Sequence, residues 1–312
     1  MNTTANIPPA VREYYDRLLL MTAYPTLIHT KFAQIRVLPE KEGDTIVFRR
    51  YNRLATVPIP LSEGITPPGA ALSVNDIKAT VDFYGNFVTI TDQVQLTVQD
   101  RVLNDASRLL AQNLGESLDE VTRDVLRSTT SVYLCANGVN GNTPTELTKT
   151  DLDSAVRVLL GQNAKMISEV VTASTGIGTS PTRPAFWGLL HTDLIDDLEN
   201  NVTGFNSTTN YPGQETVLDA EWGSTGNIRW LYTSVGSVSS ATPPVYNNFV
   251  LGQEAYGVIY LGSPSGEFYV EPLGSAGSAD ALHQRGTVGW KKPFVARILN
   301  DAFMLNVMAT HS

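Results

Sequence analysis

The chain has 312 residues and a net charge of −9, from 22 basic and 31 acidic side chains. Hydrophobic residues make up 42% of it and charged residues only 17%, which is below the roughly 25% of an average soluble protein. A sizeable core can therefore be buried, and wholesale disorder is excluded. The acidic balance argues against a protein that mainly wraps nucleic acid, because such proteins normally carry a basic excess.

The single cysteine, Cys135, excludes an internal disulfide framework and a cysteine-rich zinc site. The first residues have no basic region followed by an apolar run, so no signal peptide is expected. The sequence contains no stretch of about 18 apolar residues, so no membrane span and no membrane partner are expected. These features indicate a protein made in a reducing cytosol.

In residues 10–20 the apolar side chains, Tyr14 and Tyr15 among them, fall at helical spacing. A helix this short is not stable alone, so we expect it to pack on its own chain or on a neighbouring subunit.

The next region, residues 39–95, has the pattern of an extended ribbon. Residues 45–51 predict a strand, the proline-rich stretch 57–69 predicts an extended or edge segment, and residues 77–83 alternate between apolar and polar. A turn at 84–86 and a return strand at 87–91 would complete a long two-stranded hairpin. A lone ribbon cannot support itself in water, so it needs another surface to lie on.

Residues 97 to about 132 predict one long helix, with a capping pattern over Thr97–Asp100. Asp119 and Arg123, four residues apart, are expected to pair on its polar side. The apolar stripe has gaps of three or four residues and consists of Val98, Val102, Ala106, Leu109, Leu110, Leu114, Leu118, Val121 and Val125.

The C-terminal half alternates short elements with polar loops. We expect a helix at 151–160, a buried strand at 185–191, a helix capped by Thr192 and running through Leu198, and a core segment at 248–260. The last residues predict three strands, at 286–291, 294–299 and 302–307.

No constellation of residues supports catalysis, a cofactor or a bound metal. Gly176-Ile177-Gly178 lacks the following helix of a dinucleotide site, and the serines of 262–266 do not fit a nucleophile elbow. The four histidines are far apart in the sequence, and His191 is best explained as a packed core residue. Asp196, Asp197 and Glu199 could bind a cation, but solvated charge is the simpler interpretation.

Arg49, Arg50 and Arg53 form the one basic cluster. It could contact nucleic acid, but we favour pairing with acidic residues of an adjacent subunit.

Several segments, in order, resemble the major capsid proteins of tailed bacteriophages. Ala10-Val11-Arg12-Glu13-Tyr14-Tyr15 is similar to the family's N-terminal segment, and residues 45–51, 61–67 and 84–92 are similar to the strands and tip of its hairpin. His283-Gln284-Arg285-Gly286-Thr287-Val288-Gly289-Trp290-Lys291 is similar to the closing motif of a podovirus-type subfamily.

The resemblance implies an α+β fold, the tailed-phage major capsid protein fold, in five parts. Residues 1–38 would be an N-terminal arm, 39–95 an extended β-hairpin loop, and 96–135 a peripheral domain with a spine helix. Residues 136–282 would form mainly an axial domain, and 283–312 would close the peripheral domain with strands.

The implied function is a major capsid protein that self-assembles through hexamers and pentamers into an icosahedral shell enclosing a double-stranded DNA genome. The implied partners are other copies of the chain, a scaffolding protein, a portal protein and a decoration protein, with only weak contact to DNA. The protein would be assembled in the host cytoplasm and would reside in the virion. The expected inter-subunit contact residues are Tyr14, Tyr15, Arg49, Arg50, Arg53, Glu63 and Lys78.

Two other function classes stay open at this point. One is a carbohydrate- or receptor-binding structural module of a virion, in which Trp187, Trp222, Trp230 or Trp290 would stack on sugars, although core packing is the commoner fate of tryptophan. The other is a hydrolase with an unrecognised acid pair.

Overall fold

The computed structural model describes residues 28–41, 43–54, 63–64, 69–92, 102–167, 184–210, 218, 220–262, 266–273, 275, 280 and 282–312. The predicted N-terminal helix, the tip of the hairpin and the capping segment Thr97–Asp100 lie outside these residues. None of the helices in the described part of the chain is long and apolar enough to cross a membrane.

The first layer is a five-stranded sheet around one long strand, β14 (Arg285–Ile298). Phe294 of β14 pairs with Tyr260 on one side and with Asp82 on the other, so the strands that carry these two residues flank β14 on opposite sides. The other strands of this sheet are β1 (Gln34–Leu38), β4 (Asp82–Thr91), β12 (Tyr256–Leu261) and β13 (Glu267–Glu271). β1 pairs in parallel with β12 and forms the outer strand on that side.

The second layer is an eight-stranded sheet with the strand order β5-β15-β11-β6-β9-β8-β7, to which β10 adds beside β11. Its strands are β5 (Val132–Leu134), β6 (Phe186–His191), β7 (Phe205–Ser207), β8 (Glu221–Thr225), β9 (Ile228–Thr233), β10 (Val238–Ser239), β11 (Val245–Leu251) and β15 (Met304–Thr310). The short 3-10 turns are η2 (Thr192–Leu194), η3 (Thr208–Asn210) and η5 (Asp301–Phe303).

One face of this sheet is covered by α4 (Lys149–Gly161) and α5 (Ile195–Asn200). Thr148 caps α4 by accepting a hydrogen bond from the backbone N–H of Asp151. Leu152 and Leu159 of α4 are buried against Trp230 and Val250 of the sheet. The apolar stripe predicted for residues 151–160 is thus the face that holds the helix in place.

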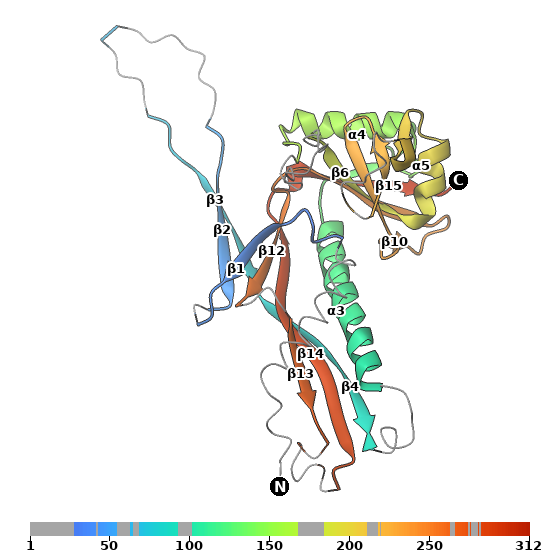
Figure 1. Ribbon diagram of the computed structural model, residues 1–312. Helices are drawn as coiled ribbons and strands as arrows, with labels where there is room; N and C mark the ends of the chain where they lie inside the picture. The colour runs from blue at the N-terminus through green and yellow to red at the C-terminus, as the bar shows by residue number, and fades with distance from the viewer. Residues whose placement is uncertain are drawn as a thin grey trace, which may run out of the picture.

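The long helix α3 (Val102–Arg127) connects the two sheets (Figure 1). Leu110 and Leu114 belong to one core with Trp290 of the first sheet, and this core continues to Trp187 of the second. Asn113 adds polar contacts, because its Oδ1 accepts from Trp290 Nε1 at 3.2 Å and from Asn86 Nδ2 at 2.9 Å. The helix therefore fixes the position of one sheet relative to the other.

A two-stranded hairpin of β2 (Thr45–Tyr51) and β3 (Val74–Thr80) projects from the body (Figure 1). Its root is anchored by a small core in which Ala79 and Val81 pack with Leu38 and Ile259. Beyond this root, the described part of the hairpin extends away from both sheets.

Four expectations about the elements were wrong. The predicted turn at 84–86 is the middle of β4, and residues 74–80 pair with β2 rather than with residues 87–91. Gly85 is required by close strand packing instead, because a Cβ there would lie 2.8 Å from the carbonyl oxygen of Trp290. The long helix ends at Arg127, and Leu109 on its expected apolar stripe is 63% exposed.

The predicted strands at 286–291 and 294–299 form one continuous strand, because Pro293 is accommodated in the β14–β4 ladder. The C-terminal residues divide between the layers: β14 lies in the five-stranded sheet, whereas β15 lies inside the eight-stranded sheet between β5 and β11.

Candidate functional site

The outward face of the hairpin is exposed along its whole described length. Across the ladder Val47 pairs with Lys78, and Tyr51 pairs with Val74. Tyr51 is 61% exposed, and the other exposed apolar side chains on β2, β3 and the residues that follow or precede them are Val47, Leu54, Leu72 and Val74. Several exposed apolar side chains on one projecting element indicate a surface that contacts another molecule.

The predicted arginine cluster divides into one paired and two unpaired members. Arg49 makes a bidentate contact with Asp76 across the ladder, with Nε–Oδ1 at 3.0 Å and Nη2–Oδ2 at 3.2 Å. This contact lowers the pKa of Asp76. Arg50 and Arg53 are exposed and make no ion pair within the described part of the chain. Arg49 therefore pairs with an acidic residue of its own chain rather than of an adjacent subunit.

The remaining predicted contact residues are not brought together. Glu63 and Lys78 are both exposed. Lys78 lies within β3, and Glu63 lies in the segment between β2 and β3. Tyr14 and Tyr15 lie outside the described residues.

A cleft missed by sequence reasoning runs along the root of the hairpin. Five consecutive residues of β2, from Ile46 to Arg50, line a cavity of about 520 Å³ whose opposite wall includes Gln34 and Arg36 of β1. A second cavity of about 570 Å³ shares Arg50 and Ile77 with the first and extends it to the junction of the two sheets. β1 and β2 are neighbours in the sequence, but β1 pairs with β12 and β2 pairs with β3. No local sequence pattern therefore reveals the cleft between them.

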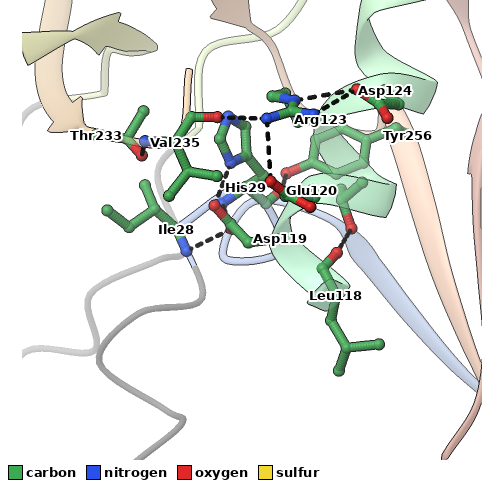
Figure 2. Close-up of polar contacts among 11 residues, drawn as sticks. Ile28, His29, Leu118, Asp119, Glu120, Arg123, Asp124, Thr233, Val235 and Tyr256 are labelled. Atoms are coloured by element: carbon green, nitrogen blue, oxygen red, sulfur yellow. Dashed lines mark hydrogen bonds and ion pairs between the residues drawn. The ribbon is translucent and has the colours of Figure 1, made fainter. Parts of the chain in front are cut away.

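A buried polar junction fixes the first described residues to α3 (Figure 2). The carboxylate of Asp119 accepts hydrogen bonds from the backbone N–H groups of Ile28, at 2.9 Å, and His29, at 2.7 Å. Its second oxygen lies 2.6 Å from His29 Nδ1, and both side chains are only 1% exposed. Tyr256 of β12 donates its hydroxyl to the carbonyl of His29. The chain before β1 is thereby tied to both the helix and the five-stranded sheet.

The predicted pair of Asp119 with Arg123 was wrong, because Asp119 faces inward to His29. Arg123 instead bonds Asp124 at 2.9 Å and donates to the carbonyl oxygen of Val235 at 2.9 Å. Val235 belongs to the loop after β9, so Arg123 fastens α3 to the eight-stranded sheet (Figure 2). The His29 ring also meets Phe249 of β11 edge-on, at 6.4 Å between centroids.

Lys292 on β14 is an unusual buried cation. It is only 4% exposed, and its Nζ lies 4.5 Å from the centroid of the Tyr260 ring. No carboxylate pairs with it among the described residues. Burial lowers the pKa of Lys292 to about 8.

The groups considered for chemistry are structural. Burial raises the pKa of the Cys135 thiol, so this side chain is an inert core residue as expected. His191 is buried, and burial lowers its pKa. Asp197, which could have joined a cation site, is 1% exposed and accepts from Asn201 and from the backbone of Ser312. Within the described ranges, no group of three His, Cys, Asp or Glu side chains could hold a metal ion.

The tryptophans do not form a sugar-binding platform. Trp187, Trp230 and Trp290 are at most 4% exposed. Trp222 is partly buried, meets Tyr232 edge-on and donates its Nε1 to Glu199 at 2.8 Å. Core packing, the commoner fate of tryptophan, therefore explains these residues.

Comparison with known proteins identifies the class. The family model described as phage capsid protein matches residues 74–299, which is well over half of the chain. The chain therefore belongs to the phage capsid protein family, and it is a structural component of the virion rather than an enzyme. No curated protein sequence matches it.

Solved phage capsids share the fold at low sequence identity. The capsid of Ralstonia phage GP4 matches with a TM-score of 0.65 and 11% identity, over 90% of this chain and 87% of that chain. The capsid of cyanophage P-SCSP1u matches with 0.60 and 14%, over 90% and 87%. The capsid of cyanophage Pam1 matches with 0.58 and 16%, over 91% and 93%.

Proposed function

We propose that this chain is the major capsid protein of a tailed double-stranded DNA phage of the podovirus type. Copies assemble through hexamers and pentamers into a closed icosahedral shell. The observation that carries the proposal is the hairpin, whose exposed Tyr51, Leu72 and Val74 lie on an element with little core of its own. An isolated ribbon of this kind is stabilised by lying on another subunit.

The two layers take distinct roles in this proposal. The five-stranded sheet and α3 form the peripheral domain, and the eight-stranded sheet forms the axial domain that meets the capsomer axis. β15 belongs with the axial domain, since it pairs with β5 and β11. The hairpin is the extended loop, and the residues before β1 are the N-terminal arm that Asp119 anchors.

The contact residues follow from the same assignment. Arg50, Arg53, Glu63 and Lys78 contact neighbouring subunits, supported by their exposure on or beside the hairpin. Arg49 contributes to such a contact together with Asp76, as a preformed pair. Tyr14 and Tyr15 of the arm join them.

Further partners are a scaffolding protein, a portal protein and a decoration protein. Contact with the packaged DNA is weak, and the net charge of −9 supports this because phosphate binding depends on a basic excess. Binding of duplex DNA by capsomers that falls steeply with salt would argue against it.

Coexpression with the phage's scaffolding protein, followed by electron microscopy, tests the proposal. We expect particles of uniform diameter from the wild type and loss of particles from the double variant Tyr51→Ser with Leu72→Ser. The matched control is Val139→Ser, which removes a side chain that is 63% exposed away from the hairpin. A wild-type chain that stays monomeric with its scaffolding protein would overturn the proposal.

A further inference from the structure

The free edge of β2 exposes unpaired backbone groups. Val81 N donates to Asp44 O at 2.8 Å and Asn52 N donates to Ser73 O at 2.9 Å, at the two ends of the β2–β3 ladder. In an antiparallel ladder the hydrogen-bonded pairs recur every second residue, so the even-numbered residues of β2 bond to β3. The backbone groups of Val47 and Arg49 therefore face the cleft, and β2 pairs only with β3 among the described strands.

A second long edge belongs to β4. Asp92 N donates to Gln284 O at 3.1 Å, which makes the even-numbered residues of β4 the ones bonded to β14. Consistently, the N–H of Phe87 donates to the side chain of its neighbour Asn86 at 2.9 Å. The backbone groups of Phe83 and Gly85 thus face outward, and β4 pairs with no described strand other than β14.

This second edge is apolar and nearly uncharged. Phe83 is 59% exposed and Phe87 65%, and Asp82 is the only charged residue of the strand. A long, exposed and apolar edge strand is a template for pairing with another chain unless it is covered.

The free edges of β2 and β4 both offer unpaired backbone N–H and C=O groups. They lie on different sides of the five-stranded sheet. β4 flanks β14 on the side opposite β12 and β1, whereas the cleft lies between β1 and β2. A contact between two different patches of identical subunits is head-to-tail, and such contacts form a ring when the rotation between successive subunits closes.

We propose that β2 of one copy adds its free edge to β4 of the next copy, in an antiparallel register with Arg50 opposite Asp82. In this register Arg49 lies opposite Phe83 and Val47 lies opposite Gly85, so that the outward backbone groups of both strands meet. Arg50 and Asp82 are exposed and make no ion pair within the described residues, and they form a cross-strand pair between the copies. The inference rests on the proposed self-assembly and names the surfaces that it uses.

The same register joins like faces of the two strands. Phe48 and Arg50 lie on the face of β2 that carries the partly buried Ile46, and Asp82 lies on the same face of β4 as the partly buried Tyr84. The added strand therefore continues the partly buried face of the neighbouring copy's sheet, and the exposed side chains of Val47, Phe83 and Phe87 lie together on the opposite face.

A charge swap tests the register. Arg50→Asp and Asp82→Arg, each alone, place like charges opposite each other and are expected to abolish particles or raise the critical assembly concentration severalfold. The variant carrying both changes restores assembly. Arg157→Glu on α4, an exposed arginine of the other layer, is the control expected to assemble as the wild type does.

Mixing the two single variants gives a second readout. Alternating copies satisfy every contact in a six-membered ring but cannot alternate in a five-membered one, so hexamers form without closed shells.

A disulfide trap tests proximity independently. In assembled particles, Arg50→Cys combined with Asp82→Cys is expected to give a ladder of covalent multimers on oxidation. Either single variant, and Arg50→Cys combined with Tyr269→Cys on β13, should give none. Cys135 is buried and does not interfere.

The outcomes separate this inference from the proposed function. Wild-type particles together with full assembly of both single charge variants, or with no ladder from the cysteine pair, overturn the strand pairing alone. Absence of particles from the wild type itself overturns the proposed function.

Discussion

His29 and Asp119 are 90 residues apart in the chain, yet His29 Nδ1 lies 2.6 Å from the Asp119 carboxylate in the interior of the molecule. The same carboxylate caps two backbone N–H groups at the point where the described chain begins. One acidic side chain of α3 thus holds Ile28 and His29 in place against the helix.

Asp119→Ala should destabilise the protein by about 3–5 kcal/mol, because it leaves the His29 ring and two buried backbone N–H groups without their hydrogen-bond acceptor. His29→Ala should cost less, about 1.5–3 kcal/mol, since the backbone hydrogen bonds to Asp119 remain. The free energy of unfolding of the unassembled chain in urea measures both.

The control for this pair is Glu120→Ala, which removes the next carboxylate along α3, 54% exposed, and should stay within about 0.5 kcal/mol of the wild type. Equal losses from Asp119→Ala and Glu120→Ala would contradict the importance of the buried junction.

The buried amine of Lys292 predicts a stability that rises with pH. Its pKa is lowered from 10.5 to about 8 by burial, so between these values the unfolded chain binds more protons than the folded chain. Relative to Lys292→Met, the wild type should gain up to about 3 kcal/mol as the pH rises from 8 to 10.5. The comparison is needed because the buried Cys135 thiol, whose pKa is raised, lowers the stability of both proteins over the same range.

Lys292→Met should remove this rise and should be more stable than the wild type at pH 7, since it replaces a buried charge by an apolar chain. Denaturation at a series of pH values measures both effects. Lys291→Met, at the exposed neighbouring position, is the control that should keep the rise. A stability difference between the wild type and Lys292→Met that stays constant from pH 8 to 10.5 would rule the explanation out.

Gly188 on β6 should tolerate no side chain. A Cβ there would lie 2.3 Å from Cε3 of Trp230, a ring that is completely buried. Gly188→Ala is expected to cost about 1–3 kcal/mol. Gly161→Ala at the end of α4 has nothing within 4 Å and should be neutral or stabilising by up to about 1 kcal/mol. Thermal unfolding compares the two, and a Gly188→Ala variant as stable as Gly161→Ala would contradict the packing.

Asp301 should stiffen the connection between the two layers. Its carboxylate accepts from the hydroxyls of Thr129 and Thr130 and from Thr130 N at 3.2 Å, where the chain leaves α3 for β5. In Asp301→Ala, hydrogen exchange of residues 128–131 should be about tenfold faster, because a loss of about 1–3 kcal/mol in local stability is expected. Asp196→Ala, on the surface of α5, should leave these rates unchanged. Unaltered exchange in Asp301→Ala would show that the connection is held by other contacts.

The elements with a clear local period were predictable from sequence. The helices at 102–127 and 149–161 and the buried strand at 186–191 follow from spacing alone, and the order of segments led to the capsid family. The partners of strands were not predictable, since pairing is decided by tertiary contact. Gly85 looked like a turn residue, but it is a glycine because β14 passes too close for a Cβ.

The candidate site was only partly visible for a related reason. The exposed arginines of β2 stood out as a basic cluster, but nothing in the sequence places Arg36 across a cleft from them. Asp119 occupies a regular helical position four residues before Arg123, and this spacing predicts that both lie on the polar side of the helix. Only the return of Ile28 and His29 to the helix explains why a carboxylate is buried there.

The parallel pairing of β1 with β12 has a consequence for how the protein is produced. Gln34 pairs with Gly257, so this edge of the sheet can form only after most of the intervening chain has been synthesised and has folded. Topologies dominated by such distant pairings fold slowly and expose apolar strands to aggregation in the meantime. The yield of folded subunits in an infected cell should therefore depend on chaperone capacity, and overexpression without added chaperone should give mainly insoluble material.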